Sequence, residues 1–143
     1  MIKTLEELIA DIYKKNKKYK ENAYLLIFEV LDRYHTILTL EGRVDAKTRH
    51  LNAKGLYREI ILYAIDKYGL LAGHVLESFG LTNAYDIGEL IGIMIDNRLL
   101  IKGDNDSIDD FKALGDAPFH HVLKPYYAVY LDTTIVKKQS FQS

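Results

Sequence analysis

Histidines are the first side chains to consider for chemistry in this chain of 143 residues, because imidazoles bind metals and exchange protons near neutral pH. The sequence contains His35, His50, His74, His120 and His121. It lacks the H-E-x-x-H pattern, which would place two imidazoles on one helix face. The last two histidines are adjacent, and neighbouring side chains on a helix diverge by about 100°, so they do not readily share an ion. The histidine spacing therefore predicts no metal site, and no cofactor is expected.

Asp86 and Glu89 are the acidic pair with the best spacing for chemistry, since they lie one helical turn apart. Two such carboxylates could share a site for general acid–base catalysis, which also requires burial and a substrate pocket. Stabilisation of a helix N-terminus by negative charge explains the same pair. The absence of cysteine excludes thiol catalysis and thiolate metal sites. No catalytic residue is predicted, and the chain is expected not to be an enzyme.

Gly88 and Gly92 stand four residues apart on the helix predicted at 86–97, so they leave two bare patches on one face. Each glycine costs a helix roughly 1 kcal/mol relative to alanine. We therefore expect another element to approach this face closely. The first candidate is a second helix of the same fold, and the alternative is a partner or ligand.

A run of lysines is the one feature typical of nucleic-acid binding. It comprises Lys14, Lys15, Lys17, Lys18 and Lys20, with Tyr13 and Tyr19 interleaved. Basic residues with stacking aromatics can hold a phosphate backbone, although such a run at a helix end is more often simply solvated. Nucleic acid is therefore kept as an alternative partner.

The elements that would position these residues are mainly helices. Apolar residues recur at three- and four-residue spacing over 2–13, where Thr4 and Glu7 form a capping box. A second helix is predicted over 22–33, apolar on most sides and therefore central. A strand over 24–30 is the alternative for the same apolar run.

Three further helices are predicted, at residues 53–68, 71–79 and 86–97. Asn52 is a suitable N-cap for the first of them, and Gly69 and Gly80 are suitable ends for the first and second. Together they form a central three-helix unit that resembles a winged helix. Its third helix carries acids and no basic residue before Arg98, which argues against conventional DNA reading.

Three segments favour extended structure, at residues 37–40, 98–102 and 126–136. The expected fold class is therefore mainly α (α+β), a compact multi-helix domain with a small β element. Residues 1–143 are expected to form a single globular domain, with 137–143 as a frayed tail. No signal peptide or membrane span is evident, so a cytoplasmic protein without membrane contact is expected. The net charge is −1.

Motif residues over roughly 20–120 carry a resemblance to a known family. They are Ala23-Tyr24, Arg49-His50, Leu56, Ala64, Tyr68-Gly69, Val75-Leu76, Phe79-Gly80, Asp86-Ile87-Gly88-Glu89, Leu99-Leu100 and Asp110-Phe111. Their spacing is similar to that of a family of uncharacterised small bacterial proteins. Leu70, Phe79 and Ile87 depart from that pattern, where the family has proline, tryptophan and phenylalanine. The resemblance implies a bacterial origin and a common fold but no activity, and Arg49, His50, Asp86 and Glu89 fall on its motif positions.

The favoured function is a non-enzymatic interaction domain that binds a protein partner or itself through the glycine-bearing helix or tyrosine-rich surfaces. The first alternative is a small ligand-binding protein or enzyme that uses Arg49, His50, Asp86 and Glu89. The second alternative is nucleic-acid binding through the lysine run.

Overall fold

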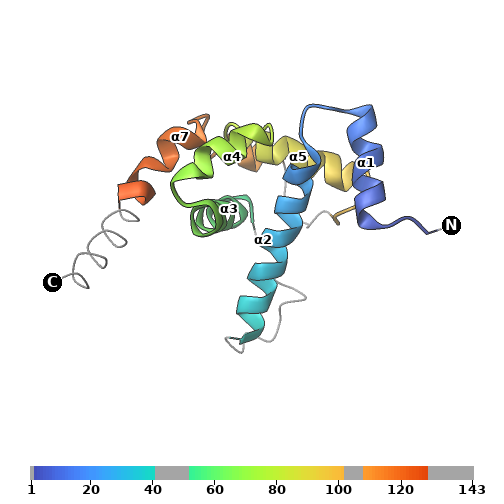
Figure 1. Ribbon diagram of the computed structural model, residues 1–143, viewed down its shortest axis with the longest axis horizontal. Coiled ribbons are helices and arrows are strands. Elements are labelled where there is room, and N and C mark those ends of the chain that lie inside the picture. The colour runs from blue at the N-terminus through green and yellow to red at the C-terminus, as the bar shows by residue number, and fades with distance from the viewer. Residues whose placement is uncertain (1, 41–51, 102–107, 129–143) are drawn as a thin grey trace.

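A computed structural model describes residues 2–40, 52–101 and 108–128 of the chain (Figure 1). Its elements in chain order are α1 (Leu5–Lys15), α2 (Glu21–Leu40), α3 (Ala53–Tyr68), the 3-10 turn η1 (Gly69–Leu71), α4 (Ala72–Ser78), α5 (Ala84–Asp96), α6 (Ile108–Lys112) and α7 (Phe119–Val122). Helices α4 and α5 lie along the long axis, with α1 at one end and α7 at the other, while α2 runs away from this row (Figure 1). None of the described helices combines the length and apolarity needed to cross a bilayer.

Side-chain caps fix where α1, α3 and α5 begin. Thr4, Asn52 and Asn83 precede α1, α3 and α5, and the side-chain oxygen of each accepts a hydrogen bond from the amide three residues later, at 3.2, 2.7 and 3.2 Å. Such bonds satisfy amides that have no partner within the helix. The predicted caps at Thr4 and Asn52 are confirmed. Helix α5 begins two residues earlier than predicted, because Asn83 caps it.

One apolar core joins the helices. Helix α2 contributes Ala23, Tyr24, Leu26, Ile27 and Val30, all buried, in agreement with its predicted central place. The main helices α1, α3, α4 and α5 and the short helices α6 and α7 each add buried residues to the same cluster. Since burial of apolar surface is the dominant favourable term in folding, this shared core holds the short helices in place.

The predicted β element is absent from the part of the chain that the structure describes. Residues 37–40 continue α2. Residues 98–100 form a turn and bend, residue 101 has no regular structure, and residues 126–128 are helical. The turn forms because Arg98 has a φ of 60° and the amide of Leu99 folds back to the Met94 carbonyl at 2.8 Å. The strand predictions are therefore wrong for these residues, since β-propensity depends on neighbouring strands that this fold does not supply. Residues 102, 129–136 and the expected tail at 137–143 lie outside the described residues.

A polar cluster joins the outer surfaces of α2 and α3. The Glu29 carboxylate accepts hydrogen bonds from the Tyr63 hydroxyl and, at 2.9 Å, from the Lys67 ammonium. The Tyr63 hydrogen bond, followed by that of Lys67, lowers the pKa of Glu29, while partial burial opposes the shift. The charged form of Glu29 therefore stabilises the contact between the two helices.

This cluster predicts a pH dependence of stability. Since the folded-state pKa of Glu29 is lowered, its contribution is present above the unfolded-state pKa of about 4.3 and is lost as the pH falls through the folded value. Glu29→Gln should lower the free energy of unfolding at pH 7 by up to about 1 kcal/mol, because the pair is half-exposed and screened. Urea unfolding at pH 7 and pH 3 measures this. The difference between wild type and variant should be smaller at the lower pH, and a constant difference would contradict the assignment.

Candidate functional site

The segment between α1 and α2 packs against the turn between α4 and α5. The amide of Lys20 donates to the Phe79 carbonyl at 3.0 Å, and the Tyr19 side chain is fully buried. A Cβ added to Gly80, whose φ is +94°, would lie 2.7 Å from the Lys18 carbonyl oxygen. The chain thus passes Gly80 so closely that only glycine fits. This contact brings the lysine run to the start of α5, where the predicted acidic pair lies.

Asp86 and Glu89 meet at the buried Tyr19 hydroxyl. The distances from this oxygen to Asp86 Oδ1 and Glu89 Oε1 are 3.2 and 3.1 Å. The Thr82 amide donates to the other Asp86 oxygen at 2.8 Å, and Lys18 Nζ lies 2.7 Å from Glu89 Oε1. Burial, followed by the two carboxylate charges, raises the pKa of Tyr19, and the Glu89 hydrogen bond raises that of Lys18. The hydroxyl therefore stays protonated and donates, and the acidic pair fastens the segment to α5.

The lysine run is divided by this packing. Lys18 pairs with Glu89, and Lys20 lies 5.8 Å from the centre of the Tyr13 ring. The remaining members, Lys14, Lys15 and Lys17, are exposed. The buried Tyr19 ring cannot stack on a base, and a lysine ammonium already occupies the region beside Tyr13. The lysine run therefore presents positive charge at the surface, but neither of its tyrosine rings is free to stack on a base in the way that the sequence suggests.

Helix α6 covers the glycine-bearing face of α5 at Gly88. A Cβ at this position would lie 2.8 Å from the Cβ of Phe111, and both residues are buried. The element that approaches the glycine is thus a helix of the same chain, and Gly88 has no surface left for a partner. Gly92, one turn later, is half-buried.

Arg49 and His50 lie outside the described residues, so the structure does not place them beside Asp86 and Glu89.

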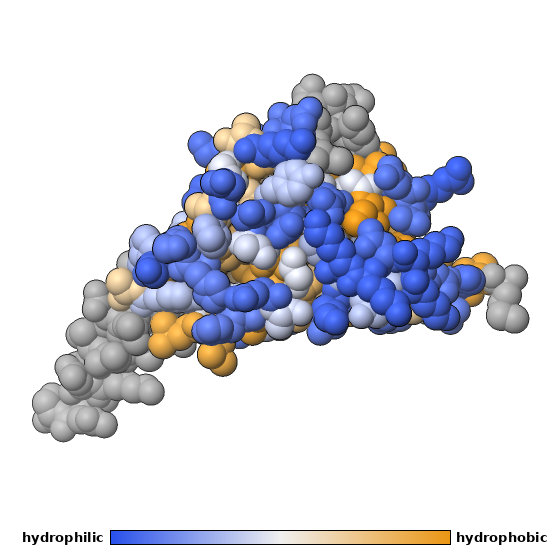
Figure 2. All heavy atoms as spheres, turned by 90° about the horizontal axis from the view of Figure 1, so that it is seen from above, coloured by the Kyte–Doolittle hydropathy of each residue, from blue (hydrophilic) through white to orange (hydrophobic). Residues whose placement is uncertain are grey.

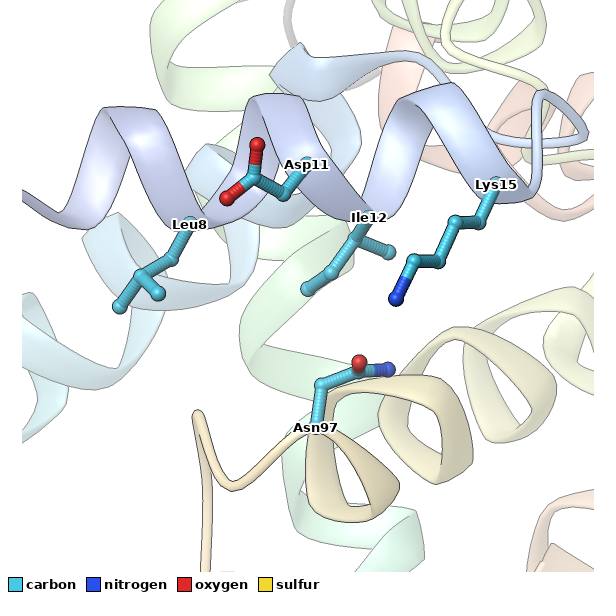
Figure 3. A pocket seen from close by; sticks show the side chains of 5 residues that line it. All are labelled: Leu8, Asp11, Ile12, Lys15 and Asn97. Atoms are coloured by element: carbon cyan, nitrogen blue, oxygen red, sulfur yellow. The ribbon is translucent and has the colours of Figure 1, made fainter. Parts of the chain in front are cut away.

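A small pocket lies between α1 and the end of α5 (Figure 3). It has a volume of about 90 Å³ and is lined by Leu8, Asp11, Ile12, Lys15 and Asn97. Figure 3 shows that all these residues except Asn97 project from α1, while Asn97 closes the opposite side. Metabolite sites usually measure about 300 Å³ or more, so this pocket is suited to the tip of a single side chain.

A wider hollow lies near the start of α5. It measures about 560 Å³ and is lined by Asn83, Tyr85, Lys112, Gly115 and Asp116. The Lys112 ammonium lies 5.4 Å from the centre of the Tyr85 ring, a cation–π contact within the chain. Its charged residues, Lys112 and Asp116, have opposite signs, and its lining residues are exposed or half-buried. It therefore has the size of a ligand site but no buried polar group that would orient a ligand.

His74, Glu77 and His120 form a cluster that the histidine spacing does not predict. Each offers one ligand atom, and these atoms lie within 4.8 Å of one another. His74 and Glu77 stand three residues apart on α4, while His120 belongs to α7. In the sequence, His74 is followed one helical turn later by an acid, Glu77, and not by a second histidine. This pairing is the signal for the cluster. The third member is recognisable only from the fold.

Comparison with protein-family models, with curated proteins and with solved structures found nothing that matches this chain. Function is therefore inferred from the geometry of the described residues alone.

Proposed function

We propose that this chain is a non-enzymatic interaction domain that binds a protein partner, or a second copy of itself, along the outer edge of α1. This α1 edge consists of Ile2, Leu5 and Leu8, which are 98%, 36% and 39% exposed. Leu5 and Leu8 lie one turn apart on the helix, and Ile2 just precedes it. Apolar side chains that gather on one exposed element are typical of interaction surfaces, whereas single scattered ones are ordinary. The exposure of this edge is the observation that supports the proposal.

The small pocket beside the α1 edge supports the same proposal. Leu8 belongs to both, and Ile12 adds a second apolar wall. Binding energy in interfaces concentrates where a side chain fills such a pocket, surrounded by polar residues that exclude water. Asp11 and Lys15 provide this polar surround. Figure 2 shows a mostly hydrophilic face, with hydrophobic atoms at the end where the N-terminus lies and also at the opposite end.

The two alternatives have less support from the described contacts. Ligand binding or catalysis by Asp86 and Glu89 would require them to release Tyr19 and Lys18. Nucleic-acid binding would rest on Lys14, Lys15 and Lys17 without a stacking aromatic, and charge alone gives only non-specific contact.

Two finer expectations remain part of the proposal. We propose the cytoplasm as the location of the protein. We also propose that α3, α4 and α5 correspond to the helices of a winged-helix-like unit. Protein docking is the proposed use of this unit, because its third helix, α5, presents acids such as Asp96 and not bases.

Replacing Leu8, the apolar residue shared by the α1 edge and the small pocket, should weaken association. Native mass spectrometry of the purified protein is expected to show a dimer or a stoichiometric complex. Leu8→Asp introduces a charge that would have to be desolvated in the interface, so the dissociation constant should rise at least about tenfold. Circular dichroism should remain unchanged, because Leu8 lies at the edge of the core.

Leu71→Asp is the matched control, since Leu71 is 63% exposed and lies on η1, away from the α1 edge. This variant should associate as the wild type does. A wild-type protein that is monomeric and free of any partner would overturn the proposal, and so would equal loss in the two variants.

A further inference from the structure

The backbone of α4 presents two metal-ligating side chains on one face. His74 and Glu77 are three residues apart, the spacing at which helical side chains are neighbours. Both are exposed, so a dissolved ion can reach them. The third ligand, His120, is half-buried and comes from α7, which packs across α4.

The core determines where His120 lies. The preceding residue, Phe119, is buried, its ring stacks on Tyr57 with 6.0 Å between centres, and its amide donates to the Thr82 carbonyl at 2.8 Å. Leu123, one turn later, is also fully buried. Since the backbone is held on both sides of His120, its imidazole is presented to α4 at a fixed place.

Gly73 makes room for the imidazole. A Cβ at this position would lie 2.8 Å from His120 Nδ1 and 3.1 Å from its Cε1, which is too close for any other residue without a shift of the ring. The Gly73 amide also donates to the Tyr127 hydroxyl at 2.8 Å, which ties the following helical turn to α4. The close approach of α7 to α4 is thus specified on both sides of His120.

The distances suit a first-row divalent ion. His120 Nε2 lies 2.5 Å from a Glu77 oxygen, and the His120 ring meets the His74 ring edge to face at 5.0 Å between centres. Tetrahedral ligands at about 2.1 Å from zinc are separated from one another by about 3.4 Å. The ligand atoms lie between 2.5 and 4.8 Å apart, a range that includes this separation, and the exposed His74 and Glu77 side chains are the ones that would rotate to reach it.

We propose that His74, Glu77 and His120 bind one divalent transition-metal ion, for which Zn²⁺ is the probe. Two imidazoles and a carboxylate are the ligands that zinc, copper, nickel and ferrous iron accept, whereas magnesium and calcium prefer oxygen alone. Three protein ligands leave a four-coordinate ion one open position for water or an incoming group. The site is separate from the α1 edge and does not depend on the proposed interaction.

The position of His74 distinguishes this site from a structural ion pair. Glu77 and His120 are enough to fasten α7 to α4, and their hydrogen bond lowers the pKa of Glu77. His74 is not needed for that bond. It is the ligand whose loss should affect metal binding and leave the contact between helices intact.

Isothermal titration calorimetry with Zn²⁺ and the full chain, freed of any histidine tag, tests the proposal. The wild type should bind one ion per chain, and His74→Ala should bind it at least about tenfold more weakly, with an unchanged thermal midpoint in the absence of metal. The visible absorption of Co²⁺, which strengthens in four-coordinate sites, should appear with the wild type and be lost with His74→Ala. These results would support the site.

His121→Ala is the matched control, because His121 is exposed and adjacent to the cluster but not part of it. It should bind Zn²⁺ as the wild type does. Three results would overturn the proposal: no binding by the wild type, equal binding by His74→Ala, or equal weakening by His74→Ala and His121→Ala. The last of these would indicate adventitious binding by surface histidines.

Discussion

Gly80→Ala is expected to lower the free energy of unfolding by about 2–5 kcal/mol, from two separate costs. A residue with a Cβ at φ +94° is strained by roughly 1–2 kcal/mol. In addition, the Cβ would lie 2.7 Å from the Lys18 carbonyl oxygen, and relief of such overpacking typically costs about 1–3 kcal/mol. The Lys18 carbonyl cannot move away at low energetic cost. The buried Tyr19 and the hydrogen bond from the Lys20 amide to the Phe79 carbonyl hold the segment between α1 and α2 in place.

Gly115→Ala separates the two costs. Gly115 has a φ of +95°, and nothing lies within 4 Å of where its Cβ would be. It should therefore lose only the conformational part, roughly 1–2 kcal/mol. Urea unfolding of both variants measures the difference. The slope of the unfolding free energy against urea concentration should be the same in both. If the two variants lose the same amount of unfolding free energy, the inferred close contact between Lys18 and Gly80 is wrong.

Gly69 and Gly80 also show which parts of the fold could be predicted from sequence. The sequence predicts that both end helices, and both have a positive φ where a helix stops, at 57° and 94°. The caps Thr4 and Asn52 were predictable for a similar reason. In each case the signal is local, because one residue type satisfies or releases the backbone of its own helix end.

The extended segments show where local signals fail. Residues 37–40 are rich in β-favouring side chains, yet they complete a helix of 20 residues that begins at Glu21. A strand requires a partner strand for its backbone groups, whereas a helix continues by bonding to its own preceding turn. Within the described residues no second strand is present, so the helical option prevails.

The apolar stripe of α1 was predictable, but its burial was only partly so. The periodicity of the first helix indicated one buried face, and Ile9 and Ile12 are indeed buried. Leu5 and Leu8 belong to the same stripe and remain exposed. Periodicity reports that a helix has an apolar side, but not how wide a surface the rest of the fold provides to cover it.

The candidate sites depend on contacts that are distant in sequence. The pairing of Asp86 with Glu89 is visible on one helical turn, but their partner Tyr19 is 67 residues from the first and 70 from the second. The metal-ligating cluster likewise needs α7 to bring His120 to Glu77, 43 residues away. Such meetings follow from how the core packs, and no spacing rule along the chain reveals them.

Tyr19→Phe is expected to lower the free energy of unfolding by about 1–3 kcal/mol, because hydrogen bonds to charged groups are worth more than neutral ones. The variant removes the hydroxyl that joins Asp86 and Glu89 to the segment between α1 and α2. The cost should fall toward the lower end of this range. Thr82 still donates to Asp86, and Lys18 still pairs with Glu89, so neither carboxylate is left without a partner. Guanidinium unfolding at neutral pH measures the loss.

Tyr24→Phe is the matched comparison and should not lower the free energy of unfolding. Tyr24 and Tyr19 are both 0% exposed, but the Tyr24 hydroxyl has no hydrogen-bond partner among the residues that the structure describes. Burying an unsatisfied hydroxyl costs about 1–3 kcal/mol, so its removal should leave stability unchanged or raise it by about 1 kcal/mol. The two substitutions delete the same atom from the same core and differ only in what that atom contacts. Equal destabilisation by both would show that packing of the ring, and not the carboxylate contacts, decides the role of Tyr19.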